Sequence, residues 1–193
     1  MNISFVGLGK LGLPLACCLV QSGNKVLGVD KNEYVLNTLN QGKLPFYEPG
    51  LDKIFHHVNF LGFTDSYQRA IDETEATIIL VNTQLGDNGY SSEFVEDVLT
   101  DLAMNLRKST KKRHLIVLSS TVLPGTIAKL IKLVEKISKR NYGEGFGFSY
   151  VPDFVKLGNV IEDFKNPEFF LIGARSEEHT SELQSRFGIS YAV

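Results

Sequence analysis

The chain has few cysteines, little excess of charge and no long uninterrupted hydrophobic run. Its 193 residues contain two cysteines, and 20 basic against 22 acidic residues leave a formal net charge of −2. This balance offers no basic surface to nucleic acid or to an anionic membrane, so neither is expected as a partner. Glycines, Lys10 and Pro14 interrupt the apolar N-terminus and no basic segment precedes it, which argues against a signal peptide or a transmembrane helix. We therefore expect a cytoplasmic protein.

The two cysteines, Cys17 and Cys18, are adjacent in an apolar segment. Neighbours on a helix point in different directions, so they do not easily form a disulfide with each other. No partner for redox or metal chemistry accompanies them, and we expect buried, unreactive thiols. The pair His56-His57 also lacks an acid or cysteine at ligand spacing, so a solvated helix end is favoured over a metal site.

Segments of strand and helix type alternate along the chain, which predicts an α/β fold with a doubly wound, mostly parallel sheet. We expect strands at residues 3–6, 26–29, 76–81, 115–119, 146–151 and 169–172. We expect helices at residues 11–20, from Asn32 to about 40, at 51–56, around 94–106 and after Pro124-Gly125. There is no internal repeat or low-complexity linker. Residues 1–174 are predicted to form one dinucleotide-binding domain of the Rossmann type.

The most informative motif is Gly7-Leu8-Gly9-Lys10-Leu11-Gly12, which joins the first strand to the first helix. In such a turn Gly7 permits the tight bend, Gly9 lets the backbone approach a pyrophosphate, and Gly12 lets helix and strand pack closely. The helix N-terminus adds amide donors and a partial positive charge. Asp30 ends the second strand and can accept both ribose hydroxyls of an adenosine, which favours NAD over its 2′-phosphorylated relative. The less favoured alternative is a glycine-rich turn that binds no ligand.

Polar loops follow the later strands at their carboxyl ends, where doubly wound sheets bind ligands. Thr83 lies in the first of these loops and Thr121 in the second, and a third contains Pro152-Asp153-Phe154. A single hydroxyl in a loop is as often a turn-stabilising group. The shared edge favours contact of Thr83 and Thr121 with the ribose, the nicotinamide amide or a catalytic water.

Four blocks occur in an order that resembles the N-terminal half of the nucleotide-sugar 6-dehydrogenases, the group of UDP-glucose and UDP-N-acetylmannosamine dehydrogenases. The blocks are GLGKLGLPLA (7–16), PFYEPGL (45–51), SSTVLPGT (119–126) and YVPDFVKLGNVIEDF (150–164). The resemblance runs from Met1 to about Ala174. Four blocks in the right order are far more specific than the glycine motif alone.

The resemblance implies an enzyme that oxidises the C6 alcohol of a nucleotide sugar to a carboxylate and reduces two NAD in succession. UDP-glucose is the expected substrate, and the full-length protein is expected to be a homodimer. The implied NAD site consists of Gly7, Gly9, Leu11, Gly12, Asp30, Thr83 and Thr121. The implied catalytic residues are Thr121, which would help to hold a water, and Asp153. The implied substrate-binding residues are Asp153, Phe154, Val155, Lys156 and Leu157.

The chain departs from the family pattern at several of these places. The family usually has glutamate where this chain has Asp153, which is one methylene shorter, and Leu157 replaces a second glutamate, as in some branches. Gln84 stands where proline is usual. Val35 stands where many members have lysine or arginine near the adenosine, and Lys31 is a candidate to compensate.

The family's cysteine nucleophile, its lysine and asparagine partners, its dimerising helix and its second sugar-binding domain all lie beyond the matched region. Without a thiolate no covalent intermediate forms for the second hydride step, so this chain is expected to bind NAD without completing the oxidation. Two alternatives are a β-hydroxyacid dehydrogenase cofactor domain, which has a similar glycine motif, and a non-catalytic NAD-binding module. The YEPGL and Pro-Asp-Phe blocks argue against the first alternative.

Residues 175–193 break the rhythm of strands and helices and are predicted to be a non-native tail. Residues 175–185, RSEEHTSELQS, are identical to one translated frame of a common short-read sequencing adapter. Residues 189–193, ISYAV, match the translation of the adapter segment that follows the sample index. We exclude this tail from the fold, as one excludes a fusion scar. A genuine polar C-terminal helix is the alternative.

Overall fold

The computed structural model, which describes residues 1–83, 85–86, 89–169 and 171–174, is built on one twisted sheet of seven strands. The strand order is β3-β2-β1-β4-β7-β8-β9, and all neighbouring pairs are parallel except β8 and β9. The strands are β1 Asn2–Val6, β2 Lys25–Val29, β3 Gly62–Thr64, β4 Ala76–Ile79, β7 Leu115–Leu118, β8 Gly147–Tyr150 and β9 Gly173–Ala174. A separate antiparallel hairpin consists of β5 Leu85–Gly86 and β6 Gly89–Tyr90. The expected doubly wound, mostly parallel sheet is therefore confirmed.

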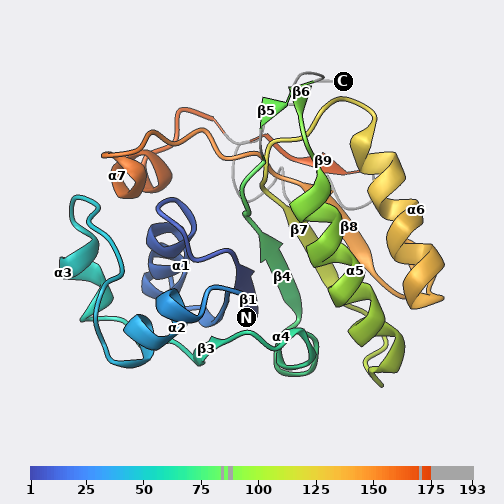
Figure 1. Cartoon of the computed structure of the whole chain (residues 1–193), viewed down its shortest axis with the longest axis horizontal. Coiled ribbons are helices and arrows are strands. Elements are labelled where there is room, and N and C mark those ends of the chain that lie inside the picture. The colour runs from blue at the N-terminus through green and yellow to red at the C-terminus, as the bar shows by residue number, and fades with distance from the viewer. Residues whose placement is uncertain (84, 87–88, 170, 175–193) are drawn as a thin grey trace.

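Helices cover both faces of this sheet (Figure 1). They are α1 Gly12–Gln21, α2 Glu33–Asn40, α3 Leu51–Phe55, α4 Tyr67–Glu73, α5 Glu93–Lys108, α6 Thr126–Ser138 and α7 Val160–Lys165. In Figure 1, α1, α2, α3 and α7 lie to the left of the central strands, and α5 and α6 lie to the right. Within the described residues, no helix combines the length and apolar character needed to cross a membrane.

Each face of the sheet has its own hydrophobic core, because successive side chains of a strand point to opposite faces. In β1, Phe5 belongs to the core under α1, α2, α3 and α7, whereas Val6 belongs to the core under α4, α5 and α6. The same alternation places Val26 of β2 in the first core and Leu27 in the second. Burial of each such side chain stabilises the fold by about 1.5–3 kcal/mol. These two cores fix the position of the strand ends.

The carboxyl ends of the parallel strands lie level with one another. Val6 of β1 pairs with Val29 of β2 on one side and with Ile79 of β4 on the other. Ile79 in turn pairs with Leu118 of β7, and Leu118 pairs with Tyr150 of β8. The loops that follow these strands therefore meet along one edge, with β2 and β4 on opposite sides of β1. Ligands of doubly wound sheets bind at this point of reversal.

Most expected elements are confirmed, but the last strand was placed wrongly. Residues 169–172 were expected to form a strand, whereas the strand is Gly173–Ala174. The ring of Phe169 instead packs against Phe154, with ring centroids 4.7 Å apart, so its apolar character serves a loop contact. β3, α4, α7 and the hairpin of β5 and β6 were not expected. The predicted tail, residues 175–193, lies outside the described residues, as does Gln84.

Candidate functional site: a dinucleotide cleft

A cleft of about 450 Å³ opens at the carboxyl ends of β1, β2 and β4. Its floor is formed by Gly7 and Gly9 after β1, its near wall by Asp30, and its far wall by Val81 and Asn82 after β4. Helices α4 and α5 close the side with Tyr67, Phe94, Asp97 and Val98. The sequence patterns predicted the glycines and Asp30, but these four residues were not expected at the site.

The three glycines of the turn have three different surroundings. Gly7 has a φ of +96°, and a Cβ placed there would lie 2.1 Å from the carbonyl oxygen of Leu80. A Cβ on Gly12 would lie 1.9 Å from the carbonyl oxygen of Gly7, so helix α1 packs directly on the turn. A Cβ on Gly9 would meet no protein atom within 4 Å. Gly9 thus leaves open the space through which a ligand can approach the backbone.

Asp30 connects the glycine turn to the end of β2. Its Oδ2 accepts a hydrogen bond from the backbone N–H of Leu8 at 2.7 Å, and its Oδ1 accepts one from Asn32 at 2.8 Å. Asn32 caps α2, as expected, by accepting from the amides of Tyr34 and Val35. A carboxylate oxygen has two lone pairs, so both oxygens of Asp30 retain capacity for ribose hydroxyls. The carboxylate therefore both fixes the turn and faces the cleft.

Helix α1 begins directly behind the glycine turn. Leu11 is its N-cap residue, and its side chain offers no acceptor to which the amides of the first turn could donate. Orphan amides at a helix N-terminus, together with the helix dipole, favour a bound anion. The Leu11 side chain packs against the core beneath α1. Leu11 and Gly12, which were expected in the NAD site, do not occur among the described lining residues of the cleft.

Thr83 and Thr121 lie in the loops after β4 and β7, which are neighbours in the sheet. The buried Ser120 ties the two loops together, because its Oγ accepts from the Val81 amide at 2.8 Å and donates to the Val81 carbonyl at 2.9 Å. Thr83 is half-buried and Thr121 exposed, and Asn82 rather than either threonine lines the described wall of the 450 Å³ cleft. Ser120 was not expected to have this role, although it lies in the segment SSTVLPGT (119–126).

A second cleft, of about 360 Å³, lies beyond the end of β8. It is lined by Asp153, Phe154, Val155 and Lys156 of the expected substrate loop, together with residues 163–164 and 166–169. Leu157 is largely exposed and is not among these lining residues. Burial raises the pKa of Asp153 to about 6, and a hydrogen bond with Ser119 offsets part of this effect. Asp153 is therefore a carboxyl group that can exchange a proton near neutral pH.

The conformation of this second loop depends on a residue more than one hundred positions earlier. Glu48, only 4% exposed, accepts hydrogen bonds from the amide of Gly158 at 3.0 and 3.2 Å and from that of Val160 at 3.3 Å. Its carboxylate thus fixes the start of α7 and the end of the loop that carries Asp153. Glu48 lies in the segment PFYEPGL (45–51), but this role was not expected, because nothing local in the sequence reveals a contact with a residue so far along the chain.

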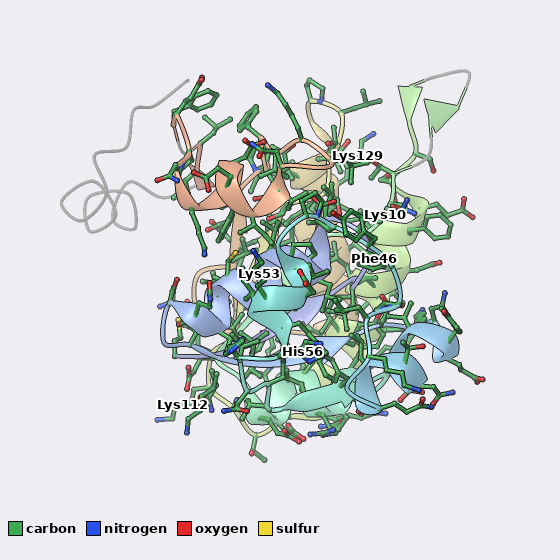
Figure 2. The ribbon with its side chains drawn as sticks, turned by 90° about the vertical axis from the view of Figure 1, so that its left-hand side faces the viewer. Lys10, Phe46, Lys53, His56, Lys112 and Lys129 are labelled. Carbon is green, nitrogen blue, oxygen red and sulfur yellow. The ribbon has the colours of Figure 1, made fainter. Side chains whose placement is uncertain are left out.

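No cysteine or histidine is among the described residues that line these two clefts. Cys17 and Cys18 are buried in the core, as expected, and burial raises the pKa of Cys17 to about 12 and also raises the pKa of Cys18. Figure 2 shows His56 on the outer side of the molecule near Lys53, at the end of α3. His57 Nδ1 lies 2.6 Å from the Lys53 carbonyl oxygen. Among the described residues, no three His, Cys, Asp or Glu side chains cluster as a metal site would require.

The strand order, the glycine turn and the acid at the end of β2 define a Rossmann-type domain that binds an adenine dinucleotide. Residues 1–188 match the model of the UDP-glucose/GDP-mannose dehydrogenase family, NAD binding domain. The chain belongs to this family and is its NAD-binding, N-terminal half. This membership sets aside the β-hydroxyacid dehydrogenase alternative and confirms NAD as the cofactor.

Similar proteins act on more than one nucleotide sugar. GDP-mannose 6-dehydrogenase of Pseudomonas putida is 34% identical, and the match covers 97% of this chain and 44% of that protein. UDP-glucose 6-dehydrogenase AglM of Haloferax volcanii is 29% identical with the same coverage of both. The crystal structure of a ternary complex of GDP-mannose dehydrogenase from Pseudomonas aeruginosa has a TM-score of 0.89 at 30% identity, covering 99% of this chain and 45% of that one. The chain thus spans less than half the length of these relatives.

Proposed function

We propose that this chain provides the cofactor half of a dehydrogenase that oxidises the C6 alcohol of a nucleotide sugar to a carboxylate. The observation that carries the proposal is the open space at Gly9, which faces a cleft of about 450 Å³ between the glycine turn and Asp30. Bound NAD supplies the hydride acceptor. The protein's contribution is to hold the acceptor close to the reacting carbon, because hydride transfer requires a separation of about 3–3.5 Å.

In this proposal the turn binds the diphosphate and Asp30 binds the adenosine ribose. The backbone near Gly9 and the N-terminus of α1 provide amide donors and a partial positive charge for the diphosphate. Asp30 accepts the ribose hydroxyls with the lone pairs that Leu8 and Asn32 leave free. Thr83 and Thr121 extend the site along the edge toward β8, since Ser120 holds their loops together.

We assign the sugar end of the reaction to Thr121 and Asp153. Thr121 holds a water or the reacting oxygen, and Asp153 takes up or releases a proton, which its raised pKa permits near neutral pH. The neighbouring loop residues Phe154, Val155, Lys156 and Leu157 contact the nucleotide sugar. The support for this placement is the 360 Å³ cleft that most of these side chains line beside the carboxyl edge of the sheet.

Which nucleotide sugar is the substrate is a separate proposal. The resemblance in the sequence suggested UDP-glucose, but the relatives include dehydrogenases of GDP-mannose as well as of UDP-glucose. GDP-mannose is therefore the first substrate to test and UDP-glucose the second. We also propose that the full-length protein is a homodimer and that it is located in the cytoplasm.

A titration of the chain with NADH tests the cofactor site directly. Wild-type protein should bind NADH with a saturable change in fluorescence, and Asp30→Ala should weaken binding by at least tenfold, as expected when a charge-assisted hydrogen bond is lost. Asp65→Ala is the matched control, since Asp65 is exposed and lies outside the cleft. Equal affinity of wild type and Asp30→Ala would contradict the placement of the ribose.

A second candidate function is a non-catalytic NAD-binding module, and the buried cysteines favour it for the chain by itself. Neither Cys17 nor Cys18 can act as the nucleophile of a covalent step, because the thiolate form of each is disfavoured in the core. Addition of GDP-mannose or UDP-glucose with NAD should produce no NADH from this chain alone. Turnover with either sugar would contradict the module and would require a nucleophile other than these cysteines.

We propose that residues 175–193 derive from adapter sequence rather than from the gene. The support is the identity of two segments to adapter translations, separated by a gap the size of a sample index. The family match extends to residue 188 and so does not itself mark a boundary at 174. Sequencing the locus with a different library chemistry should give different codons after Ala174. The same codons in the genome would refute the proposal.

A further inference from the structure

The cation nearest to Asp30 in the sequence is held by a carboxylate from another element. Lys31 directly follows Asp30, and its Nζ lies 3.0 Å from Oδ2 of Asp101 on α5. The same Nζ lies 5.7 Å from the ring centroid of Tyr67 on α4. Both contacts draw the ammonium toward the wall formed by α4 and α5. Of the described residues that line the 450 Å³ cleft, Lys31 is the only lysine or arginine.

Three carboxylates act on Tyr67, the aromatic residue beside this ammonium group. Burial raises the pKa of Tyr67, and the charges of Asp101, Asp30 and Asp97 raise it further, so all three carboxylates act on the same hydroxyl. Asp30 and Asp97 also line the cleft itself. The adenosine end of the cleft therefore carries a net negative charge even with Lys31 present. A phosphate group entering here meets repulsion unless a cation is free to bind it.

We propose that Asp101 strengthens the preference of this domain for NAD over NADP, in addition to Asp30, by holding Lys31 away from the 2′ position of the ribose. This inference rests on the proposed contact between Asp30 and the adenosine ribose. The two cofactors differ only by a 2′-phosphate, which lysine or arginine usually binds in NADP-dependent domains. Lys31 has the right charge and follows the ribose-binding acid. Its ammonium is already paired with Asp101, and the charge of Asp101 opposes a phosphate at the same place.

The test measures NADH and NADPH binding by fluorescence for the wild type and for Asp101→Asn, which keeps the side-chain shape and removes its charge. The ratio of the NADPH to the NADH dissociation constant should fall by about threefold to tenfold, as expected for one charge at a partly exposed site. Lys31→Met added to Asp101→Asn should return the ratio to the wild-type value or above. Asp101→Glu, which retains the charge, should leave it unchanged.

The control is Glu96→Gln, which removes one negative charge from the same helix. Glu96 accepts a hydrogen bond from Ser92 and does not line the described wall of the cleft. The ratio of the NADPH to the NADH dissociation constant should therefore be the same in Glu96→Gln as in the wild type. An unchanged ratio in Asp101→Asn would overturn the inference. So would a fall in the ratio that persists when Lys31→Met is added to Asp101→Asn. If Asp30→Ala weakens NADH binding while Asp101→Asn leaves the ratio unaltered, only this inference fails. If Asp30→Ala binds NADH like the wild type, the ribose placement fails and this inference with it.

Discussion

A Gly9→Ala substitution should weaken NAD binding without destabilising the fold. The new methyl group meets no protein atom within 4 Å, and Gly9 does not have the positive φ that disfavours alanine. The folded state should therefore accept it, and the reduced entropy of the unfolded chain adds about 0.4–1 kcal/mol of stability. The methyl group instead occupies the space where the diphosphate approaches the backbone. We expect the NADH dissociation constant to rise by about tenfold to a hundredfold, or 1.4–2.8 kcal/mol.

Gly12→Ala provides the opposite outcome in the same turn. Its methyl carbon would lie 1.9 Å from the Gly7 carbonyl oxygen and 3.0 Å from the ring of Phe5, so backbone must move. Such overpacking costs about 1–3 kcal/mol of folding free energy. In a domain of this size that lowers the melting temperature by about 2–12 °C.

Thermal melting and NADH fluorescence titration, performed on the wild type and both variants, separate these effects. The expected pattern is a melting temperature about 1–4 °C above that of the wild type with weak binding for Gly9→Ala, and a lowered melting temperature for Gly12→Ala. A Gly9→Ala protein that binds NADH as tightly as the wild type would show that the diphosphate does not lie against this turn. The reasoning from the open space at Gly9 would then be wrong.

Two further predictions concern residues outside the cofactor cleft. Glu48→Ala leaves the amides of Gly158 and Val160 without their acceptor and should lower the unfolding free energy by about 2–3 kcal/mol, whereas Asp65→Ala should change it by less than about 0.5 kcal/mol. Urea unfolding measures both, and hydrogen exchange at the two amides should accelerate only in the first. Burial, with Lys111 nearby, lowers the pKa of His114 to about 4, so the unfolded state binds the proton more readily between about pH 4 and 6.5. The contribution of His114 to the free energy of unfolding is fully present above about pH 7 and should be about 2 kcal/mol smaller at pH 5. Asp153, with its raised pKa, acts in the opposite sense between about pH 4 and 6, so the measured quantity is the difference between wild type and His114→Gln. Equal pH dependence in the two proteins would contradict the assignment to His114.

The first half of the sheet was predictable because its signals are local. The glycine turn, the apolar strands on each side of it and Asp30 all lie within thirty residues, and each has one structural interpretation. The cap at Asn32 is equally local, since its side chain bonds to amides two and three residues later. The core alternation of β1 and β2 follows from the two-residue period of a strand.

The missed elements depend on partners distant in the sequence. β3 has three residues, includes a glycine and is only half-buried at the sheet edge, so it has no strong apolar pattern. α7 has six residues and is fixed at its start by Glu48, more than one hundred positions away. The closure of the cleft by Tyr67 and Asp97 depends on how α4 and α5 pack beside the sheet. The Ser66 cap of α4 is a local signal, but the contacts with Glu48 and those that close the cleft leave no such signal in the chain.

The same contrast separates the two ends of the candidate site. One side of the dinucleotide cleft is built from a turn, a strand end and an acid whose hydrogen bonds to Leu8 and Asn32 are made inside one βαβ unit and the loop after it. The loop that carries Asp153 is held by contacts with Ser119, with Asp163 and, across more than one hundred positions, with Glu48, while Phe154 and Leu157 expose much of their surface. Apolar side chains exposed beside a cleft are stabilised when another surface covers them. Local hydrogen bonds therefore fix the Asp30 wall of the cofactor cleft, whereas the loop that carries Asp153 presents apolar surface that a further contact would stabilise.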